Sequence, residues 1–264
     1  MKKRESDLDR TRSLLSDLGF EHAPMVITEL VERGVREEMA LPVFLDLVLE
    51  RERAFREERR VKTSLKLSGL PVGKTLEGFD FAFQRGVERG RIELLSTCEF
   101  VRRKENVLLL GPPGVGKTHL AAGLGVRAVQ NGFSAVFLTA DELIERMRRD
   151  ESTGKGRARR WKYMNAALLI VDELGFQALD RKDAHLLFRL VSYRYERGST
   201  LITSNKSIRE WPDMLAGDEV LATAILDRLL HHCQVITIDG RSFRLRDLDR
   251  LVQPVAPREA AATR

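Results

Sequence analysis

Gly111-Pro112-Pro113-Gly114-Val115-Gly116-Lys117-Thr118 is the stretch of this 264-residue chain that decides its fold. It matches the phosphate-loop pattern G-x-x-x-x-G-K-[ST] at every specified position. Glycines let consecutive backbone N–H groups turn toward phosphate oxygens, and the helix that follows points its positive dipole end at the same anion. We expect Lys117 to reach the β- and γ-phosphates and the Thr118 hydroxyl to bind Mg²⁺. The alternative is a chance glycine-rich turn, but the pattern favours a nucleoside triphosphate site.

Short apolar segments alternate with helical segments around this loop. The expected strands are residues 106–110, 135–139, 166–171, 200–203 and 234–238. The expected helices are residues 88–101, 119–130, 141–149, 184–196 and 219–232, with a further helix opened by the capping box Ser207-Ile208-Arg209-Glu210. Continuous apolar strands between helices are typical of a parallel sheet covered on both faces. The sequence therefore predicts an α/β fold with a parallel five-stranded sheet.

The rest of the chain divides into smaller parts. Residues 1–66 show helical spacing of apolar side chains, with stops expected at Gly19 and Gly34 and a third helix from Pro42. This predicts a small helical accessory domain. DNA or a partner is its expected binding target, although its residues carry no motif for either. Residues 67–85 are expected to form a connector, residues 86–250 the nucleotide-binding domain, and residues 251–264 a frayed tail.

Composition limits the partners and the compartment. The formal net charge of +6 and the pI near 9.5 favour a polyanionic partner. Two distant cysteines, Cys98 and Cys233, indicate free thiols, and the N-terminus lacks the apolar core of a secretory signal. We therefore expect a cytoplasmic protein that does not enter a membrane.

One segment concentrates basic residues. Residues 148–162 hold two acidic side chains and seven basic ones, namely Arg148, Arg149, Lys155, Arg157, Arg159, Arg160 and Lys162. Two interpretations remain open for these seven residues, a solvated loop and a set of contacts to nucleic acid.

Polar residues follow two of the expected strands. Asp172 and Glu173 end the third strand, where Asp172 would hold Mg²⁺ and Glu173 would polarise the attacking water as general base. Asn205 follows the fourth strand and would hydrogen-bond the water or the γ-phosphate. Parallel strands end at one edge of a sheet, so these side chains are expected to meet.

Two features of the last expected helix have competing interpretations. Arg228 is an arginine donated to the γ-phosphate of a neighbouring subunit, the partner of Asp227, or a solvated cation. His231-His232-Cys233 resembles a metal site, but adjacent side chains are expected to point apart and no second pair lies at zinc spacing. The sequence therefore argues against a metal there.

The order of phosphate loop, strand with Asp-Glu, strand with Asn and helix with Arg resembles that of the AAA+ ATPases. Longer sequence stretches more specifically resemble the IstB family of transposition helper ATPases, which are related to the DnaC helicase loaders. The matching stretches are Thr75-Leu76-Glu77-Gly78-Phe79-Asp80-Phe81, Asn106 through Ala121, Val171-Asp172-Glu173-Leu174-Gly175, Glu210-Trp211-Pro212, and Leu221 through Leu229. The resemblance is strong over residues 65–250 and looser over the N-terminal helices.

The resemblance implies roles for individual residues. ATP would contact residues 111–119, including His119, with Thr118 and Asp172 as Mg²⁺ ligands. Glu173 would activate water, Asn205 would act as sensor 1, and Arg228 would act on a neighbouring subunit. Such ATPases assemble as homo-oligomers on duplex DNA, remodel it and deliver it to a transposase, the IstA-like recombinase. Only 26 residues, 239–264, follow the fifth strand, too few for the usual helical lid, and Arg241 or Arg244 is a candidate substitute for its arginine.

Two other functions remain open. A helicase loader would share this fold but act on single-stranded DNA. A nucleotide-gated interaction protein would bind ATP with negligible turnover.

Overall fold

The computed structural model describes residues 2–153 and 162–246. The chain divides into two compact units, Met1–Ser64 and Leu65–Arg264. The strands and the phosphate loop belong to the second unit, which therefore carries the candidate site.

The first unit consists of α1 (Lys2–Asp17), α2 (Ala23–Arg36) and most of α3 (Leu41–Ser68). Its small core holds Ala23, Ile27, Leu30 and Val48. The three expected helices are confirmed, but the expected stop at Gly34 is wrong. Gly34 lies inside α2, where an added Cβ would lie 2.9 Å from the Phe44 ring, so this glycine permits close helix packing.

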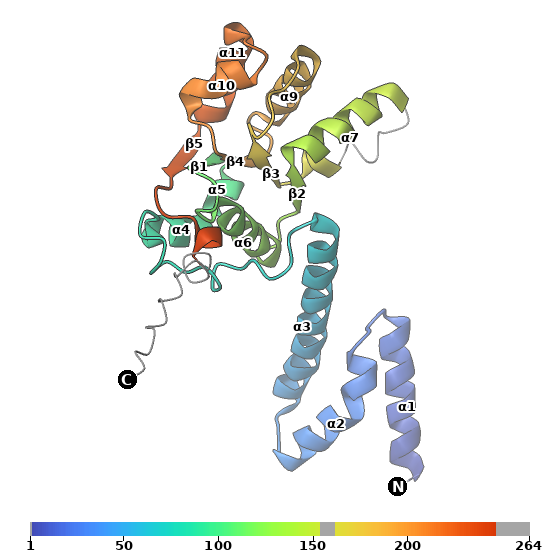
Figure 1. Ribbon diagram of the computed structural model, residues 1–264. Coiled ribbons are helices and arrows are strands. Elements are labelled where there is room, and N and C mark those ends of the chain that lie inside the picture. The colour runs from blue at the N-terminus through green and yellow to red at the C-terminus, as the bar shows by residue number, and fades with distance from the viewer. Residues whose placement is uncertain (1, 154–161, 247–264) are drawn as a thin grey trace, which may run out of the picture. The chain divides into compact units, whose positions relative to one another are not determined.

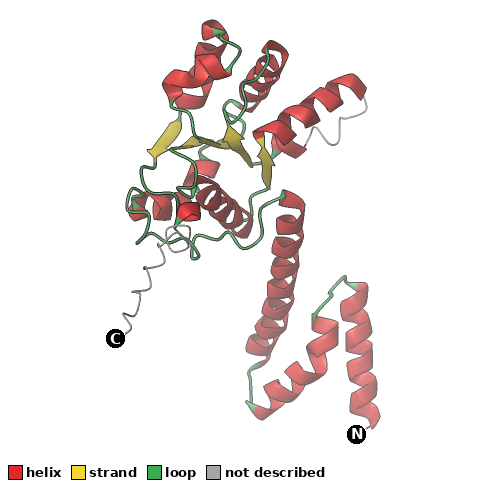
Figure 2. Ribbon diagram, viewed as in Figure 1, coloured by secondary structure: helices red, strands yellow, loops and turns green. Residues whose placement is uncertain are grey.

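The second unit contains one five-stranded sheet (Figures 1 and 2). Its strands are β1 (Asn106–Leu110), β2 (Ala135–Thr139), β3 (Leu168–Leu174), β4 (Ser199–Ser204) and β5 (Cys233–Thr237). All pairings are parallel, in the order β2-β3-β4-β1-β5. The α/β fold with a parallel five-stranded sheet is confirmed.

Helices cover both faces of this sheet (Figure 1). On one face, α7 (Ala140–Thr153), α9 (Arg181–Arg194) and α11 (Glu219–Leu230) share a core with Leu169 and Val171 of β3. On the other, α6 (Lys117–Gln130) packs so closely that an added Cβ on Gly125 would lie 2.7 Å from Ile170. The alternation of Leu169, Ile170 and Val171 between the two faces is the two-residue period of a strand.

Two expected helices differ from the structure. Residues 88–101 form α4 (Arg89–Ser96) and α5 (Glu99–Arg102), which are separated by Cys98 in the left-handed region at φ 60°. The capping box at Ser207 and Glu210 is present, but it opens a 3₁₀ turn, η1 (Ile208–Glu210), followed by the short α10 (Trp211–Met214). Both differences shorten helices beside the sheet and leave the strands unchanged.

The parallel arrangement gives the sheet two different edges. The carboxyl ends of all five strands lie at one edge, where ligands bind in open α/β sheets. After β5, the described chain continues to Arg246 with a single element, η2 (Phe243–Leu245), and no helical lid. Nor does any described helix have the length and apolar character needed to cross a membrane.

Candidate active site

The phosphate loop joins the end of β1 to the start of α6. Gly111, Gly114 and Gly116 adopt φ values of 149°, 83° and 96°, which disfavour residues with a Cβ. A Cβ on Gly111 would also lie 2.2 Å from the Ile238 carbonyl oxygen, and one on Gly114 would lie 2.0 Å from Ser242 Oγ. The loop therefore requires glycine for its backbone conformation and for its close contact with the chain after β5.

Lys117 lies over the loop from the first turn of α6. Its ammonium donates to the carbonyl oxygens of Gly111 at 2.7 Å and Pro112 at 2.9 Å. Burial lowers the pKa of Lys117; the Asp172 and Glu173 carboxylates act against this effect, and the Arg244 guanidinium adds to it. Asp172, Glu173 and Arg244 therefore lie close enough to affect Lys117, as expected for the charged groups around a bound triphosphate.

Thr118 and Asp172 meet at the tip of β3. The Thr118 hydroxyl donates to Asp172 Oδ1 at 3.0 Å, and the Thr203 hydroxyl donates to the same oxygen at 2.5 Å. Asp172 is only 3% exposed, so these hydroxyls support a nearly buried carboxylate. Hydroxyl and carboxylate oxygens are the donors that Mg²⁺ prefers, and this pair fits Mg²⁺ beside the phosphate loop.

Glu173 stands at a β-bulge. The pairing of β3 with β4 shifts register between Val171 and Leu174, and Glu173 has φ 61° although it is not glycine. Its backbone N–H donates to Thr203 Oγ1 at 2.9 Å. Consecutive side chains of a regular strand point to opposite faces, so the bulge lets both Asp172 and Glu173 serve the same edge.

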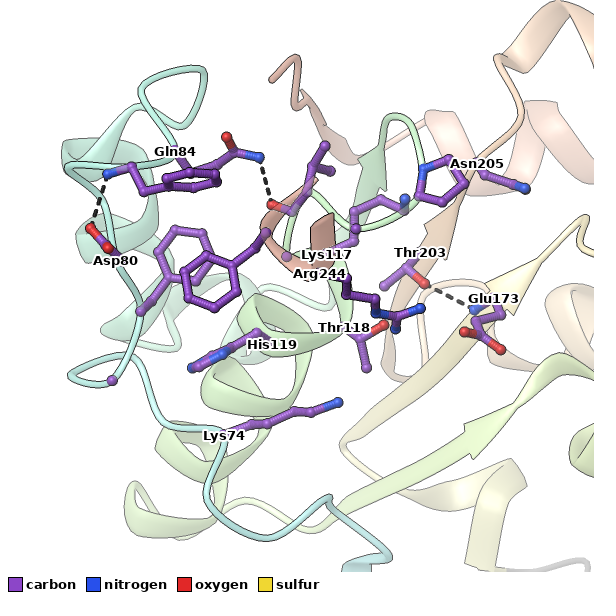
Figure 3. A pocket seen from close by; sticks show the side chains of 18 of the residues that line it. Lys74, Asp80, Gln84, Lys117, Thr118, His119, Glu173, Thr203, Asn205 and Arg244 are labelled. Carbon is purple, nitrogen blue, oxygen red and sulfur yellow. Dashed lines mark hydrogen bonds between the residues drawn. The ribbon is translucent and has the colours of Figure 1, made fainter. Parts of the chain in front are cut away.

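A cavity of about 340 Å³ opens at this edge (Figure 3). Glu173, Thr203 and Asn205 line it together with loop residues 113–118 and His119. The structure therefore brings together the candidates from the phosphate loop, β3 and β4. Thr203, which positions both carboxylate residues, had no motif that identified it.

The segment expected to be a connector forms one wall of the cavity. Lys74, Phe79, Asp80 and Gln84 line it, and the buried Gln84 side chain donates to the Val115 carbonyl oxygen at 2.9 Å (Figure 3). These contacts join residues far apart in sequence, so local pattern did not identify them. The sequence feature that came nearest to identifying this wall was the resemblance of residues 75–81 to the IstB family.

His119 faces this wall. Its Nε2 lies 2.8 Å from the Thr75 carbonyl oxygen, and its ring lies edge-on to Phe79 at 5.5 Å. His119 thus holds the 67–85 segment against the loop in addition to lining the cavity.

The chain after β5 contacts both the phosphate loop and the 67–85 wall. Phe243 N–H donates to the Gly114 carbonyl oxygen at 2.9 Å, and Arg246 forms an ion pair with Asp80 at 3.3 Å. Arg244 lines the cavity, whereas Arg241 is not among its lining residues. Of the two candidate substitutes for a lid arginine, Arg244 is the one at the site.

Arg228 lies outside this cavity. Its Nη1 donates to the Ala224 carbonyl oxygen at 2.8 Å, and its guanidinium lies 5.0 Å from the centre of the Phe188 ring. It lines a separate hollow with Asn106 and His232, residues at the amino ends of β1 and β5. The structure therefore does not bring Arg228 to the phosphate loop of its own chain.

The basic segment is only partly described. Arg148 forms a bidentate pair with Asp183, with Nε at 2.6 Å from Oδ1, and Arg149 pairs with Glu145. Lys162 is exposed. Lys155, Arg157, Arg159 and Arg160 lie outside the described residues. The bond to Asp183 gives Arg148 a structural partner within the fold.

The parallel sheet, the glycine loop after β1 and the acidic tip of β3 define a phosphate-loop nucleoside triphosphate-binding protein. The chain belongs to the IstB-like ATP-binding protein family, which matches residues 13–250. The ATP-binding protein of insertion sequence IS21 from Pseudomonas aeruginosa is 44% identical, covering 89% of this chain and 88% of the relative. The ATP-binding protein of insertion sequence IS5376 from Geobacillus stearothermophilus is 41% identical, covering 86% and 91%.

Solved structures share the AAA+ fold. DnaI superposes with a TM-score of 0.52 at 22% identity, covering 62% of this chain and 90% of DnaI. DnaA from Aquifex aeolicus, solved with AMPPCP bound, has a TM-score of 0.50 at 21% identity, covering 69% and 56%. The expected AAA+ fold and IstB-like resemblance are confirmed.

Proposed function

We propose that the protein is an ATP-hydrolysing helper of insertion-sequence transposition that binds duplex DNA and delivers it to a transposase. The observation that best supports hydrolysis is the arrangement around Asp172. Asp172 accepts a hydrogen bond from Thr118, and Thr118 and Glu173 both line the cavity beside the phosphate loop. The family and its insertion-sequence relatives support the biological role.

Different residues of this chain contribute to different steps of hydrolysis. The loop N–H groups and Lys117 bind the phosphates, and Thr118 with Asp172 would hold Mg²⁺, which neutralises phosphate charge when bound. Glu173 orients the attacking water and accepts its proton, and Asn205 provides an amide hydrogen bond at the end of β4. Arg244 adds a positive charge from the segment after β5. No covalent intermediate with the protein is needed, because positioning and electrostatics provide most of the catalysis.

Three further elements belong to this proposal. A second copy of the chain contributes Arg228, so the active form is a homo-oligomer. The exposed Lys162 and the adjoining basic residues contact duplex DNA, as the net charge of +6 favours. The N-terminal helices of residues 1–64 provide a second surface for DNA or the transposase.

ATP turnover tests the proposal. The full-length protein is assayed without DNA, with single-stranded DNA and with duplex DNA at matched salt. We expect duplex DNA to stimulate turnover most. We also expect Glu173→Gln to lower turnover by about 10²–10⁴-fold while ATP still binds, because general-base catalysis typically contributes that factor.

Each contrary outcome identifies an alternative. Glu219→Gln removes an exposed carboxylate outside the cavity and should retain wild-type turnover. Equal rates for wild type and Glu173→Gln in every condition would reject hydrolysis and favour a nucleotide-gated binding protein. Stimulation chiefly by single-stranded DNA would instead favour a helicase loader.

A further inference from the structure

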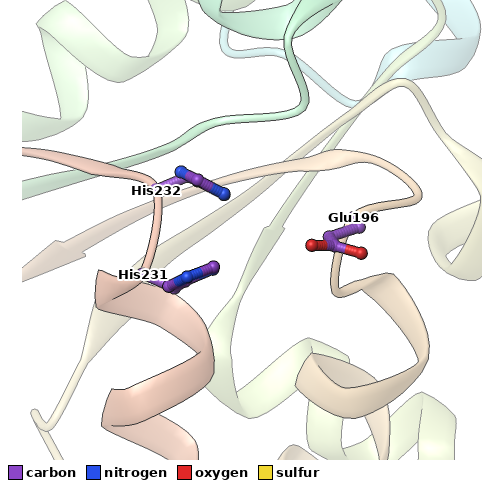
Figure 4. Close-up of side chains that lie close together, drawn as sticks. All are labelled: Glu196, His231 and His232. Carbon is purple, nitrogen blue, oxygen red and sulfur yellow. The ribbon is translucent and has the colours of Figure 1, made fainter.

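Glu196, His231 and His232 form a cluster of metal-binding side chains outside the ATP cavity (Figure 4). One donor atom from each lies within 4.8 Å of the others, and all three residues are exposed. The expectation that adjacent histidines point apart is wrong here, because the two imidazole rings lie 4.2 Å apart. Figure 4 shows the Glu196 carboxylate facing both rings from a different turn.

The two turns that carry these side chains are fixed by Asn106. Its side chain accepts from Thr200 N–H at 2.9 Å and donates to the Leu229 carbonyl oxygen at 3.0 Å. Its backbone N–H donates to the His232 carbonyl oxygen at 2.7 Å. Asn106 therefore holds the start of β4, which follows Glu196, against the end of α11, which precedes His231.

Arg194 fixes the Glu196 turn from within the protein. This arginine is 2% exposed, and its guanidinium donates to the carbonyl oxygens of Ala166 at 3.0 Å and Ser199 at 2.6 Å. Buried anchors of this kind position exposed ligands, since metal sites depend on support from surrounding residues.

The side chains themselves are available to a ligand. His231 Nδ1 lies 2.8 Å from the Tyr195 hydroxyl, which orients the ring. In the tautomer in which Nδ1–H donates to this hydroxyl, Nε2 carries the lone pair that binds a metal. Within the described chain, the side chains of Glu196 and His232 make no hydrogen bond or ion pair. Glu196 also has φ 57°, at a position after a helix that usually holds glycine. A strained residue of this kind favours a role for its side chain.

The surrounding charge defines what else the site would accept. Arg103, Lys104 and Arg228 line the adjacent hollow of about 330 Å³ together with Glu196 and His232. These cations weaken the attraction of the site for a divalent ion that carries no other ligand. Once a divalent ion is bound, they favour an anionic ligand on that ion.

We propose that Glu196, His231 and His232 bind a single Zn²⁺ ion with an open position that faces the cationic hollow. Two imidazoles and one carboxylate are a donor set that Zn²⁺ accepts, whereas Mg²⁺ prefers oxygen ligands. Ligands sharing one tetrahedral Zn²⁺ lie about 3.3 Å apart, so these exposed side chains need to close by about 1–1.5 Å. The ion would join the α9–β4 turn to the end of α11, one turn beyond Arg228.

Zinc titration of the full-length protein tests this site. The protein is purified without a polyhistidine tag and titrated, without nucleotide, with ZnCl₂ against a chromophoric indicator. Glu196→Gly and His232→Ala are compared with His185→Ala, which removes an exposed histidine of α9 outside the cluster. Glu196→Gly suits the left-handed backbone, so its loss of metal would not reflect misfolding.

We expect one Zn²⁺ bound by wild type and His185→Ala, and affinity lowered at least about tenfold in the two cluster variants, since even outer-shell changes cost about 10–100-fold. Zn²⁺ at tenfold above its Kd should raise the thermal midpoint of wild type by about 3–6 °C. That increase should be absent in the cluster variants at the same concentration. Equal affinity in all four proteins, or no bound Zn²⁺ in wild type, would overturn the proposal.

Discussion

Glu173 illustrates how a single backbone conformation determines a catalytic arrangement. Glu173 lines the cavity, and the preceding residue, Asp172, accepts from Thr118 and Thr203 beside it. The bulge at Glu173, with φ 61°, lets these two consecutive carboxylates act at the same end of β3. A left-handed conformation costs a residue with a Cβ about 1–2 kcal/mol. The site therefore retains backbone strain in exchange for two adjacent acidic groups at one strand end.

A comparison of two substitutions at Glu173 measures this strain. Glu173→Ala and Glu173→Gly both remove the carboxylate, and we expect both to lose hydrolysis. Only glycine relieves the φ of 61°, so Glu173→Gly should be more stable than Glu173→Ala by about 1 kcal/mol. In a domain of this size that difference corresponds to about 2–4 °C in thermal midpoint. Equal midpoints in the two variants would contradict strain at this residue.

The motif at residues 172–173 could be predicted from sequence, but its geometry could not. An apolar run ending in two carboxylates is a local pattern. The bulge depends on how β3 pairs with β4, and the support from Thr203 depends on the same long-range pairing. Similarly, Gln84 reaches Val115 across a sequence separation of 31 residues, which no local pattern records.

At the scale of elements, α2 depends on a carboxylate from another helix. Glu52 of α3 accepts the backbone N–H groups of Glu21, His22 and Ala23 at 2.8–2.9 Å, at the start of α2. Burial raises the pKa of Glu52, but these hydrogen bonds and one from Arg56 outweigh it and lower the pKa to about 2. The ionised carboxylate thus satisfies N–H groups that a helix start leaves without partners.

This pKa predicts acid sensitivity of the N-terminal unit. The folded pKa is depressed from 4.5 to about 2, so the stabilisation is complete above pH 4.5 and is lost as the pH falls toward 2. A shift of this size corresponds to about 3 kcal/mol for this 3%-exposed group. We expect Glu52→Gln to lower amide-exchange protection of α2 at pH 6 and to remove most of its change between pH 4.5 and 2.

Exposed Glu50 on the same helix provides the control. Glu50→Gln should leave both the protection of α2 and its pH dependence as in wild type. The Glu50 side chain is 69% exposed, and its ion pair with Arg53, at 3.8 Å, is long and exposed to solvent, so it contributes little. Equal pH profiles for Glu52→Gln and wild type would show that the Glu52 carboxylate does not support α2.

The elements themselves were largely predictable because burial leaves a local signature. All five strands lie within three residues of the expected limits, since continuous apolar runs mark strands covered on both faces. The break at Cys98 was missed because nothing about a cysteine predicts φ 60°. The sequence offered Arg241 or Arg244 from the chain after β5, and Arg244 lines the cavity, but the contact of Phe243 with the phosphate loop was missed because it depends on long-range packing.

At the scale of the whole molecule, the two edges of the sheet hold different halves of the proposed catalytic site. The phosphate loop and Glu173 lie at the carboxyl ends of the strands, whereas Arg228 lines a hollow with residues at the amino ends. One chain therefore does not bring Arg228 to its own ATP. A head-to-tail assembly, which joins different surfaces of neighbouring copies, would pair the two halves.

Mixing two inactive variants tests this pairing. Arg228→Ala retains an intact cavity, and Lys117→Ala retains an intact Arg228. In an equal mixture about a quarter of head-to-tail junctions would join two intact halves. We therefore expect up to about a quarter of wild-type turnover, because an arginine donated in trans contributes about 10³–10⁵ to the rate.

The informative control is a mixture in which both defects lie in the same cavity. Lys117→Ala mixed with Glu173→Gln leaves no cavity whole, because each subunit carries a defect beside its own phosphate loop. This mixture should remain inactive. Light scattering is used to check that it assembles to the same size as the first mixture. Recovery confined to the Arg228→Ala mixture would establish action between subunits. No recovery in a mixture shown to co-assemble would instead confine Arg228 to its contacts with Ala224 and Phe188 inside its own chain.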